Sequence, residues 1–166
     1  MLITDLTEAD KIWVKGRTEL LFGGDYVVSR DVLHDPTQLP GFIAVDSGER
    51  VGLATYHVDG DCCEVVSVDA LCQFIGVGTA LLLAVEKAAR VAGCQKLWAI
   101  TTNDNLDALR FFQKRGFTIS RVRVDGMDRI RQMKPDIPEI GYYGIAVRDE
   151  IELEKPIEAG QGWRVV

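Results

Sequence analysis

The residues best suited to chemistry lie in a glycine-containing turn between a predicted strand and a predicted helix. The strand runs from Cys62 to about Ala70, the turn contains Gly76 and Gly78, and the helix covers 79–92. A helix start has backbone N–H groups without intrahelical partners and a partial positive charge, so it attracts phosphate. Glycines let an anion approach the main chain closely. The pattern indicates an anion-binding helix start, and the alternative is a turn that needs glycine for structural reasons alone.

Two common nucleotide-binding motifs fit this turn less well. The P-loop requires Gly-Lys-Ser/Thr, whereas Gly78 is followed directly by Thr79. A dinucleotide fingerprint needs a third glycine three residues after the second, where Leu81 stands. A dinucleotide-binding oxidoreductase is therefore the least favoured of the functions considered.

Three strands with short connections precede the turn. Hydrophobic patterning predicts strands over 42–45, 51–58 and 62–70. Asp59-Gly60-Asp61 is a strong hairpin signal between the second and the third. Because links this short join only antiparallel neighbours, the three strands form an antiparallel meander.

A crossover unit follows the meander. Apolar residues recur every three or four positions along the helix over 79–92, and a further strand follows over 96–101. Strand, helix and strand make a right-handed crossover, so the strands over 62–70 and 96–101 should lie parallel. A helix over 105–116 and a strand over 117–124 complete an α+β fold with a mixed sheet.

Two regions carry weaker signals. Within 25–40, the Asp35-Pro36 and Leu39-Pro40 steps favour a loop with at most a short helix. The segment 125–166 is less regular, and we expect a C-terminal extension with a helical turn over 127–132, a loop over 141–144 and an extended stretch over 146–153. Because no linker or repeat divides the sequence, we expect a single domain over 1–166.

Charge and hydropathy exclude several partners. The 166-residue chain has a formal net charge of −6 and no dense run of Lys or Arg, which disfavours nucleic-acid binding. The most apolar stretch, 77–85, is shorter than the roughly 20 residues that span a bilayer. The N-terminus lacks the features of a secretory signal, so we expect a cytoplasmic protein without membrane contact. His34 and His57 are isolated, the cysteines follow no zinc pattern, and no metal is expected.

Two motifs resemble those of the GNAT superfamily of N-acetyltransferases. Gln73-x-x-Gly76-x-Gly78 is similar to its Gln/Arg-x-x-Gly-x-Gly/Ala motif. The stretch 105–117 is similar to its second motif, a helix closed by Gly-Phe. The core match covers 42–124, and segments 24–30 and 148–154 more loosely resemble a bacterial subgroup.

The resemblance implies a mixed α/β fold with helices on both faces of the sheet and acetyl-CoA as co-substrate. In the superfamily, acetyl-CoA lies in a V-shaped gap between two splayed parallel strands. The pantetheine arm bonds the first strand, the pyrophosphate meets amides of the turn, and the second motif also contacts the cofactor. The cofactor-binding residues implied here are Val68, Ala70, Phe74, Ile75, Gly76, Val77, Gly78, Thr79, Asn105 and Phe112.

Acetyl transfer to an amine requires removal of a proton from the ammonium, whose pKa is near 10.4. Glu64 stands where some members of the superfamily have a general-base glutamate, and Asp69 is its rival. Phe112 stands where a tyrosine often protonates the departing thiolate, so this acid is absent unless Tyr142 or Tyr143 replaces it. A thiolate can also leave unaided, only more slowly.

The run Glu150, Glu152 and Glu154 alternates with Ile151 and Leu153, as in a strand with one buried face. A solvated acidic face is the favoured interpretation. The second hypothesis is that these carboxylates surround the entrance of an amine pocket.

The leading hypothesis is therefore an N-acetyltransferase that moves acetyl from acetyl-CoA to a primary amine by direct attack in a ternary complex. The acceptor is a small-molecule or peptide amine, and a homodimer remains open. The alternative is a non-catalytic acyl-CoA-binding module, suggested by Phe74 and Ile75 within the motif and by Phe112.

Overall fold

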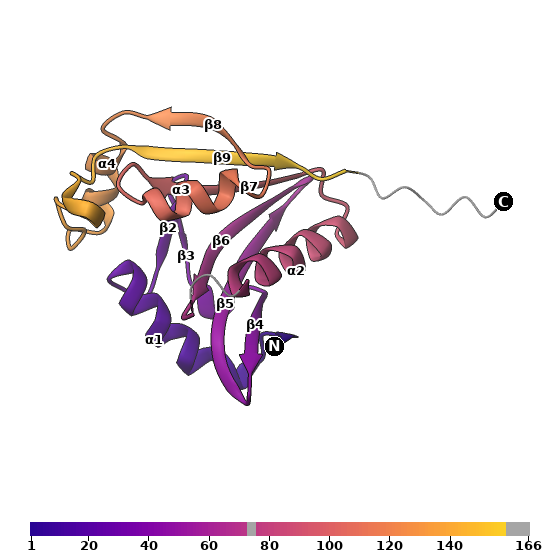
Figure 1. The fold of residues 1–166 in the computed structure, drawn as a ribbon. Helices are drawn as coiled ribbons and strands as arrows, with labels where there is room; N and C mark the ends of the chain where they lie inside the picture. Colours follow the sequence, from indigo (N-terminus) through magenta and orange to yellow (C-terminus); the bar gives the residue numbers. More distant parts are fainter. Residues whose placement is uncertain (73–75, 159–166) are drawn as a thin grey trace.

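A seven-stranded sheet runs through the computed structural model, which describes residues 1–72 and 76–158 (Figure 1). Only β6 and β7 pair in parallel, and all other neighbours are antiparallel, so the expected mixed sheet is confirmed. In spatial order the strands are β1 (Leu2–Asp5), β4 (Gly41–Asp46), β5 (Glu49–Asp59), β6 (Cys62–Ala70), β7 (Lys96–Thr102), β9 (Glu150–Pro156) and β8 (Thr118–Arg123).

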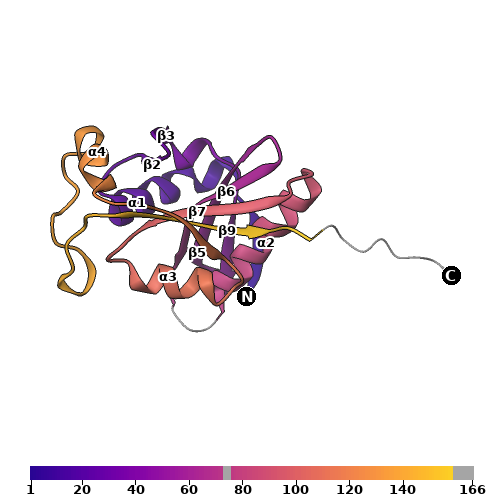
Figure 2. The ribbon, with the colours of Figure 1, turned by 90° about the horizontal axis from the view of Figure 1, so that it is seen from above.

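Helices cover both faces of the sheet, as expected. On one face, Val14 packs on Ile43 and Leu53. On the other, Leu81 joins the larger core around Ala54. Figure 2 shows α1 on one side of β6 and β7 and α3 on the other. The helices are α1 (Lys11–Phe22), α2 (Val77–Val91), α3 (Leu106–Gln113) and α4 (Gly126–Met133).

The central parallel pair diverges soon after it begins. The register of β6 with β7 extends only from Cys62 opposite Lys96 to Glu64 opposite Trp98. Beyond that point β6 continues with β5 alone, and Val66 forms a bulge because Tyr56 lies opposite Val65 while Thr55 lies opposite Ser67. The edge of β6 that faces β7 therefore has backbone groups free for another partner.

The expectation of a loop over 25–40 is wrong for its first half. That segment contains a hairpin of β2 (Val27–Ser29) and β3 (Val32–His34) and then a short 3₁₀ helix over Pro36–Gln38. Arg30 and Asp31 turn the hairpin with φ of 47° and 63°. Such left-handed pairs are normally signalled by Asn-Gly or Asp-Gly, so Arg-Asp gave no turn signal.

The described part of the extension over 125–166 is more regular than expected, because the helical turn and the extended stretch form a full helix and a central strand. β9 inserts between β7 and β8, and Ile151 and Leu153 are part of the main core. Helix α4 and a 3₁₀ turn over Tyr142–Gly144 precede it. Within the described residues, no helix has both the length and the apolar character to cross a membrane.

Candidate functional site

A cleft of about 1120 Å³ opens where β6 and β7 diverge. Its wall contains eight of the predicted cofactor-binding residues: Val68, Ala70, Gly76, Val77, Gly78, Thr79, Asn105 and Phe112. Phe74 and Ile75 lie outside the described residues. The cleft extends from the start of α2 to α4.

The start of α2 lies in the wall of this cleft. Within residues 1–72 and 76–158, the first bond of the helix runs from the N–H of Ala80 to the carbonyl of Gly76 (3.0 Å), and the amides of Val77, Gly78 and Thr79 precede it. Gly76 has a φ of 88°, and a Cβ there would meet no atom within 4 Å. Its left-handed backbone therefore borders open space, as the anion-binding interpretation requires.

Gly78 has a different reason to be glycine. It is buried, and a Cβ at this position would lie 2.9 Å from Cε2 of Phe111. The absence of a side chain lets α2 and α3 approach each other, so the structural alternative given for this turn applies at Gly78.

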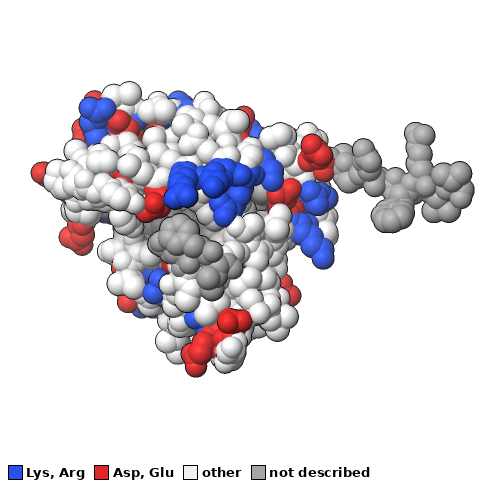
Figure 3. Space-filling model, viewed as in Figure 1, with Lys and Arg blue, Asp and Glu red and all other residues white. Residues whose placement is uncertain are grey.

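Arg115 is a residue that the sequence reasoning missed. Its Nε donates to Thr79 Oγ (3.0 Å), and its Nη1 donates to the carbonyl of Phe111 (2.8 Å). Its guanidinium lies 3.8 Å from the Phe111 ring centroid. Arg110 and Lys114 also line the cleft, and Figure 3 shows a row of cations over α3 on this face. The spacing of these three residues on one predicted helix was the available signal.

Two residues of the second motif, Asn105 and Phe112, stabilise the fold and also line the cleft. Asn105 caps α3, its Oδ1 accepting from the N–H of Ala108 (3.1 Å). Phe112 is buried, packs edge-on against Phe111 and Phe117, and shows one side to the cleft.

The two tyrosines that were left open lie in different surroundings. Tyr142 lines the cleft and is 54% exposed, and its backbone N–H donates to Asp104 Oδ2 (2.9 Å). The hydroxyl of Tyr143 donates to Asp107 Oδ2 (2.7 Å). Of the pair, Tyr142 is the one among the residues that line the cleft.

Glu64 lies at the point where β6 and β7 separate, but it is not part of the cleft wall. It is 4% exposed, and its Oε2 lies 3.1 Å from His34 Nε2. The ring of His34 in turn lies 5.2 Å from that of His57, so the fold joins two histidines that are isolated in sequence. Burial raises the pKa of Glu64. Burial, followed by the charge of His57, lowers the pKa of His34.

Asp69, the rival base, does line the cleft. Its Oδ2 accepts from Arg17 Nε at 2.6 Å, which ties the end of β6 to α1. This carboxylate is therefore engaged in an ion pair at the cleft, whereas Glu64 is buried beside an imidazole.

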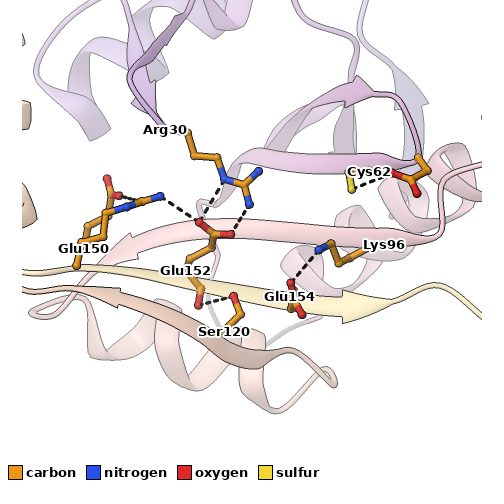
Figure 4. A network of polar contacts seen from close by, with 9 residues as sticks. Arg30, Cys62, Lys96, Ser120, Glu150, Glu152 and Glu154 are labelled. Atoms are coloured by element: carbon orange, nitrogen blue, oxygen red, sulfur yellow. Dashed lines mark hydrogen bonds and ion pairs between the residues drawn. The ribbon is translucent and has the colours of Figure 1, made fainter.

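The solvated acidic face expected for Glu150 and Glu152 is wrong, because both are only 5% exposed. Glu152 pairs with Arg30 and Arg123, and Glu150 pairs with Arg123 (Figure 4). These arginines come from the β2–β3 hairpin and β8, so the alternation within β9 could not reveal them. Of the three carboxylates, only Glu150 lines the cleft.

Comparison with known proteins decides the family. Residues 7–117 match the model of the acetyltransferase (GNAT) family. The chain belongs to the GNAT acetyltransferase family. It is 46% identical over 122 residues to the uncharacterized protein YdhI of Bacillus subtilis, covering 73% of this chain and 76% of that protein. Membership in this family supports acetyl transfer as the general activity.

Solved structures share the GNAT fold. The IAA acetyltransferase from Bacillus cereus superposes with a TM-score of 0.69 at 20% identity, over 93% of this chain and 98% of that one. A GNAT acetyltransferase from Elizabethkingia anophelis, solved with acetyl-CoA bound, gives 0.68 at 23% identity, over 93% and 97%. In residues 1–72 and 76–158 no three His, Cys, Asp or Glu side chains group to hold a metal ion.

Replacing Arg115 with glutamine should weaken CoA binding about tenfold. The reason is that the charge of the guanidinium, which would assist a hydrogen bond to CoA at the start of α2, is lost. Isothermal calorimetry with CoA measures the effect, and added salt should reduce it. Lys87→Gln removes the same charge from an exposed position further along α2 and should leave CoA affinity unchanged. Equal affinity in both variants would remove Arg115 from the binding site.

Proposed function

We propose that this protein transfers acetyl from acetyl-CoA to a primary amine by direct attack in a ternary complex. The observation that carries the proposal is one cleft that combines the edge of β6 beyond its pairing with β7, the start of α2 and Arg115. An edge of backbone groups suits the amides of pantetheine, and a helix start with an adjacent guanidinium suits a pyrophosphate. The described residues thus fit acetyl-CoA in their chemistry.

Each part of acetyl-CoA has its own contacts in this proposal. The pyrophosphate accepts hydrogen bonds from the amides of Val77, Gly78 and Thr79. The pantetheine arm follows β6 beside Val68 and Ala70. The thioester then lies near the divergence of β6 and β7, and the amine enters from the end of the cleft that α4 borders.

The reaction needs a neutral amine. Its lone pair attacks the thioester carbonyl carbon, the C–S bond breaks, and the thiolate of CoA leaves. Glu64 takes the proton of the amine through a water molecule, since this carboxylate is next to the divergence but outside the cleft wall. Its raised pKa brings it closer to the operating pH, which favours a general base.

Tyr142 is the group that we propose protonates the departing thiolate. Tyr142→Phe should lower kcat about tenfold and leave the affinity for CoA unchanged, because a thiolate can still leave unaided. Tyr143→Phe is the matched control, since its hydroxyl is bonded to Asp107. Steady-state kinetics at saturating acetyl-CoA compare the two, and equal kcat values would mean that neither is the acid.

The function itself is tested in two steps. Calorimetry measures the affinity for CoA and acetyl-CoA, and a thiol-release assay then screens small-molecule and peptide amines. Binding with amine-dependent thiol release supports the proposal. Absence of CoA binding overturns it.

A non-catalytic acyl-CoA-binding module is the second candidate, because Phe112 offers no proton at the usual position of the acid. It predicts tight binding without thiol release across the whole panel of amines, a result that would replace the enzymatic proposal.

A further inference from the structure

A second cavity, of about 410 Å³, lies beside the cleft, between the β2–β3 hairpin, β8 and the start of α4. Four arginines line it, Arg30, Arg121, Arg123 and Arg129, against two carboxylates, Asp31 and Glu150. The whole chain has a net charge of −6, so this concentration of guanidinium groups does not follow from the overall composition and is produced locally by the fold.

Among the described residues, one of the four arginines lacks an ion-pair partner. Glu152, behind the wall, pairs with Arg30 and Arg123, and Glu150 pairs with Arg123. Within residues 1–72 and 76–158, Arg121 has no ion-pair partner. An incoming anion would supply the partner that Arg121 lacks among these residues.

The inner guanidinium groups are held in position before any ligand arrives. Glu150 and Glu152 are buried and hold Arg123 and Arg30 (Figure 4), and the guanidinium of Arg30 lies 3.7 Å from the ring centroid of Trp98. Fixed donors lose little conformational freedom on binding, and a guanidinium matches the two oxygens of a carboxylate or phosphate.

The outer pair can yield to a ligand. Arg129 Nε lies 3.0 Å from Asp31 Oδ1, and the two side chains are 72% and 48% exposed. An exposed ion pair contributes little to stability, so an anion can replace Asp31 as the partner of Arg129 at low cost.

The cavity and the cleft share a wall. Glu150 and Ile130 line both, so a molecule at the α4 end of the cleft lies next to the arginines. We propose that the cavity binds a carboxylate or phosphate group of the acetyl acceptor, which is therefore an amine that also carries an anion. This inference rests on the proposed acetyl transfer for the amine, and on the four arginines for the anion.

The first experiment tests anion binding without any acceptor. Inorganic phosphate is titrated calorimetrically into protein already saturated with CoA, so that the cations over α3 are occupied. We expect binding that Arg121→Gln weakens about tenfold, because a charged hydrogen-bond donor is lost. Arg90→Gln, an exposed arginine on α2 paired with Glu86, should leave it unchanged.

Thermal unfolding of each variant checks that the fold is intact, and Arg121 is exposed, so no loss of folding is expected. Absence of phosphate binding to the CoA-loaded protein overturns the anion site, as does equal affinity in the wild type and Arg121→Gln. Saturation with CoA in the same sample reports separately on the proposed function.

The second experiment distinguishes an anion on the acceptor from a separate small anion. Thiol release is measured with amino acids against their carboxamides, and with aminoalkyl phosphates against the matching amino alcohols. We expect the anionic member of each pair to have a KM about tenfold lower, with the difference lost in Arg121→Gln. Equal KM values within each pair, together with phosphate binding, would overturn the assignment to the acceptor.

Discussion

Replacing Glu64 with glutamine is expected to lower kcat for acetyl transfer by about 10²–10⁴-fold, the usual contribution of a general base. Glutamine keeps the size of the side chain and a hydrogen-bonding oxygen beside His34 Nε2. Because Glu64 is not part of the cleft wall, the affinity for CoA should stay within about twofold of the wild type. Single-turnover kinetics and calorimetry measure the two quantities separately.

The pH profile gives a readout that a purely structural role of Glu64 would not change. A general base must be ionised, so kcat/KM falls as the pH falls through its pKa. Burial raises the pKa of Glu64, which moves this acid limb above the ordinary glutamate range near 4.3. The Glu64→Gln variant should lose this limb, so that in this range its residual rate falls with acid only as steeply as protonation of the amine requires.

Asp69→Asn is the matched control on the same strand. This substitution removes a carboxylate that lines the cleft. It also removes the ion pair with Arg17, so some loss of stability is expected. The acid limb should remain. If the limb disappears in Asp69→Asn and persists in Glu64→Gln, Asp69 is the base and the proposed role of Glu64 is wrong.

The sequence was sufficient for elements whose signals are local. The strand over 62–70 and the helix start after Gly76 follow from hairpin chemistry, apolar periodicity and glycine, and the structure agrees with them within a few residues. The β2–β3 hairpin was missed because Arg30 and Asp31 adopt left-handed conformations without a glycine. Strand β9 was only weakly indicated. Its alternating glutamates suggest one exposed face, whereas both faces of its first half are buried.

The site shows the same division. The helix start after Gly76 depends on one turn and was predicted, whereas side-chain partners from distant segments were not. Glu64 lies 30 residues from His34 in sequence, and Arg30 lies 122 residues from Glu152. The periodicity of the sequence does not predict such pairs, because they form only when the β2–β3 hairpin folds over β6 and β9. The titration of Glu64 was therefore beyond sequence reasoning.

Replacing Gly78 with valine should raise the Kd for CoA about 10- to 100-fold and lower the free energy of unfolding by about 1–3 kcal/mol. The new Cβ would lie 2.9 Å from Cε2 of Phe111 and 3.3 Å from its Cζ. That ring packs edge-on against Phe112, so it cannot move freely. Its displacement also moves Arg115, whose guanidinium stacks on the ring and bonds Thr79.

Calorimetry with CoA and chemical denaturation measure the two effects of Gly78→Val. Gly16→Val is the matched control, because Gly16 lies within α1 and a Cβ there meets no atom within 4 Å. It should leave CoA affinity unchanged and stability equal or higher, since valine is a better helix former than glycine. If Gly78→Val loses stability but keeps its affinity for CoA, the stacked Arg115 is not part of the binding site. Unchanged stability would instead mean that α3 moves away at little energetic cost. Close contact between α2 and α3 would then not be the reason for glycine at this position.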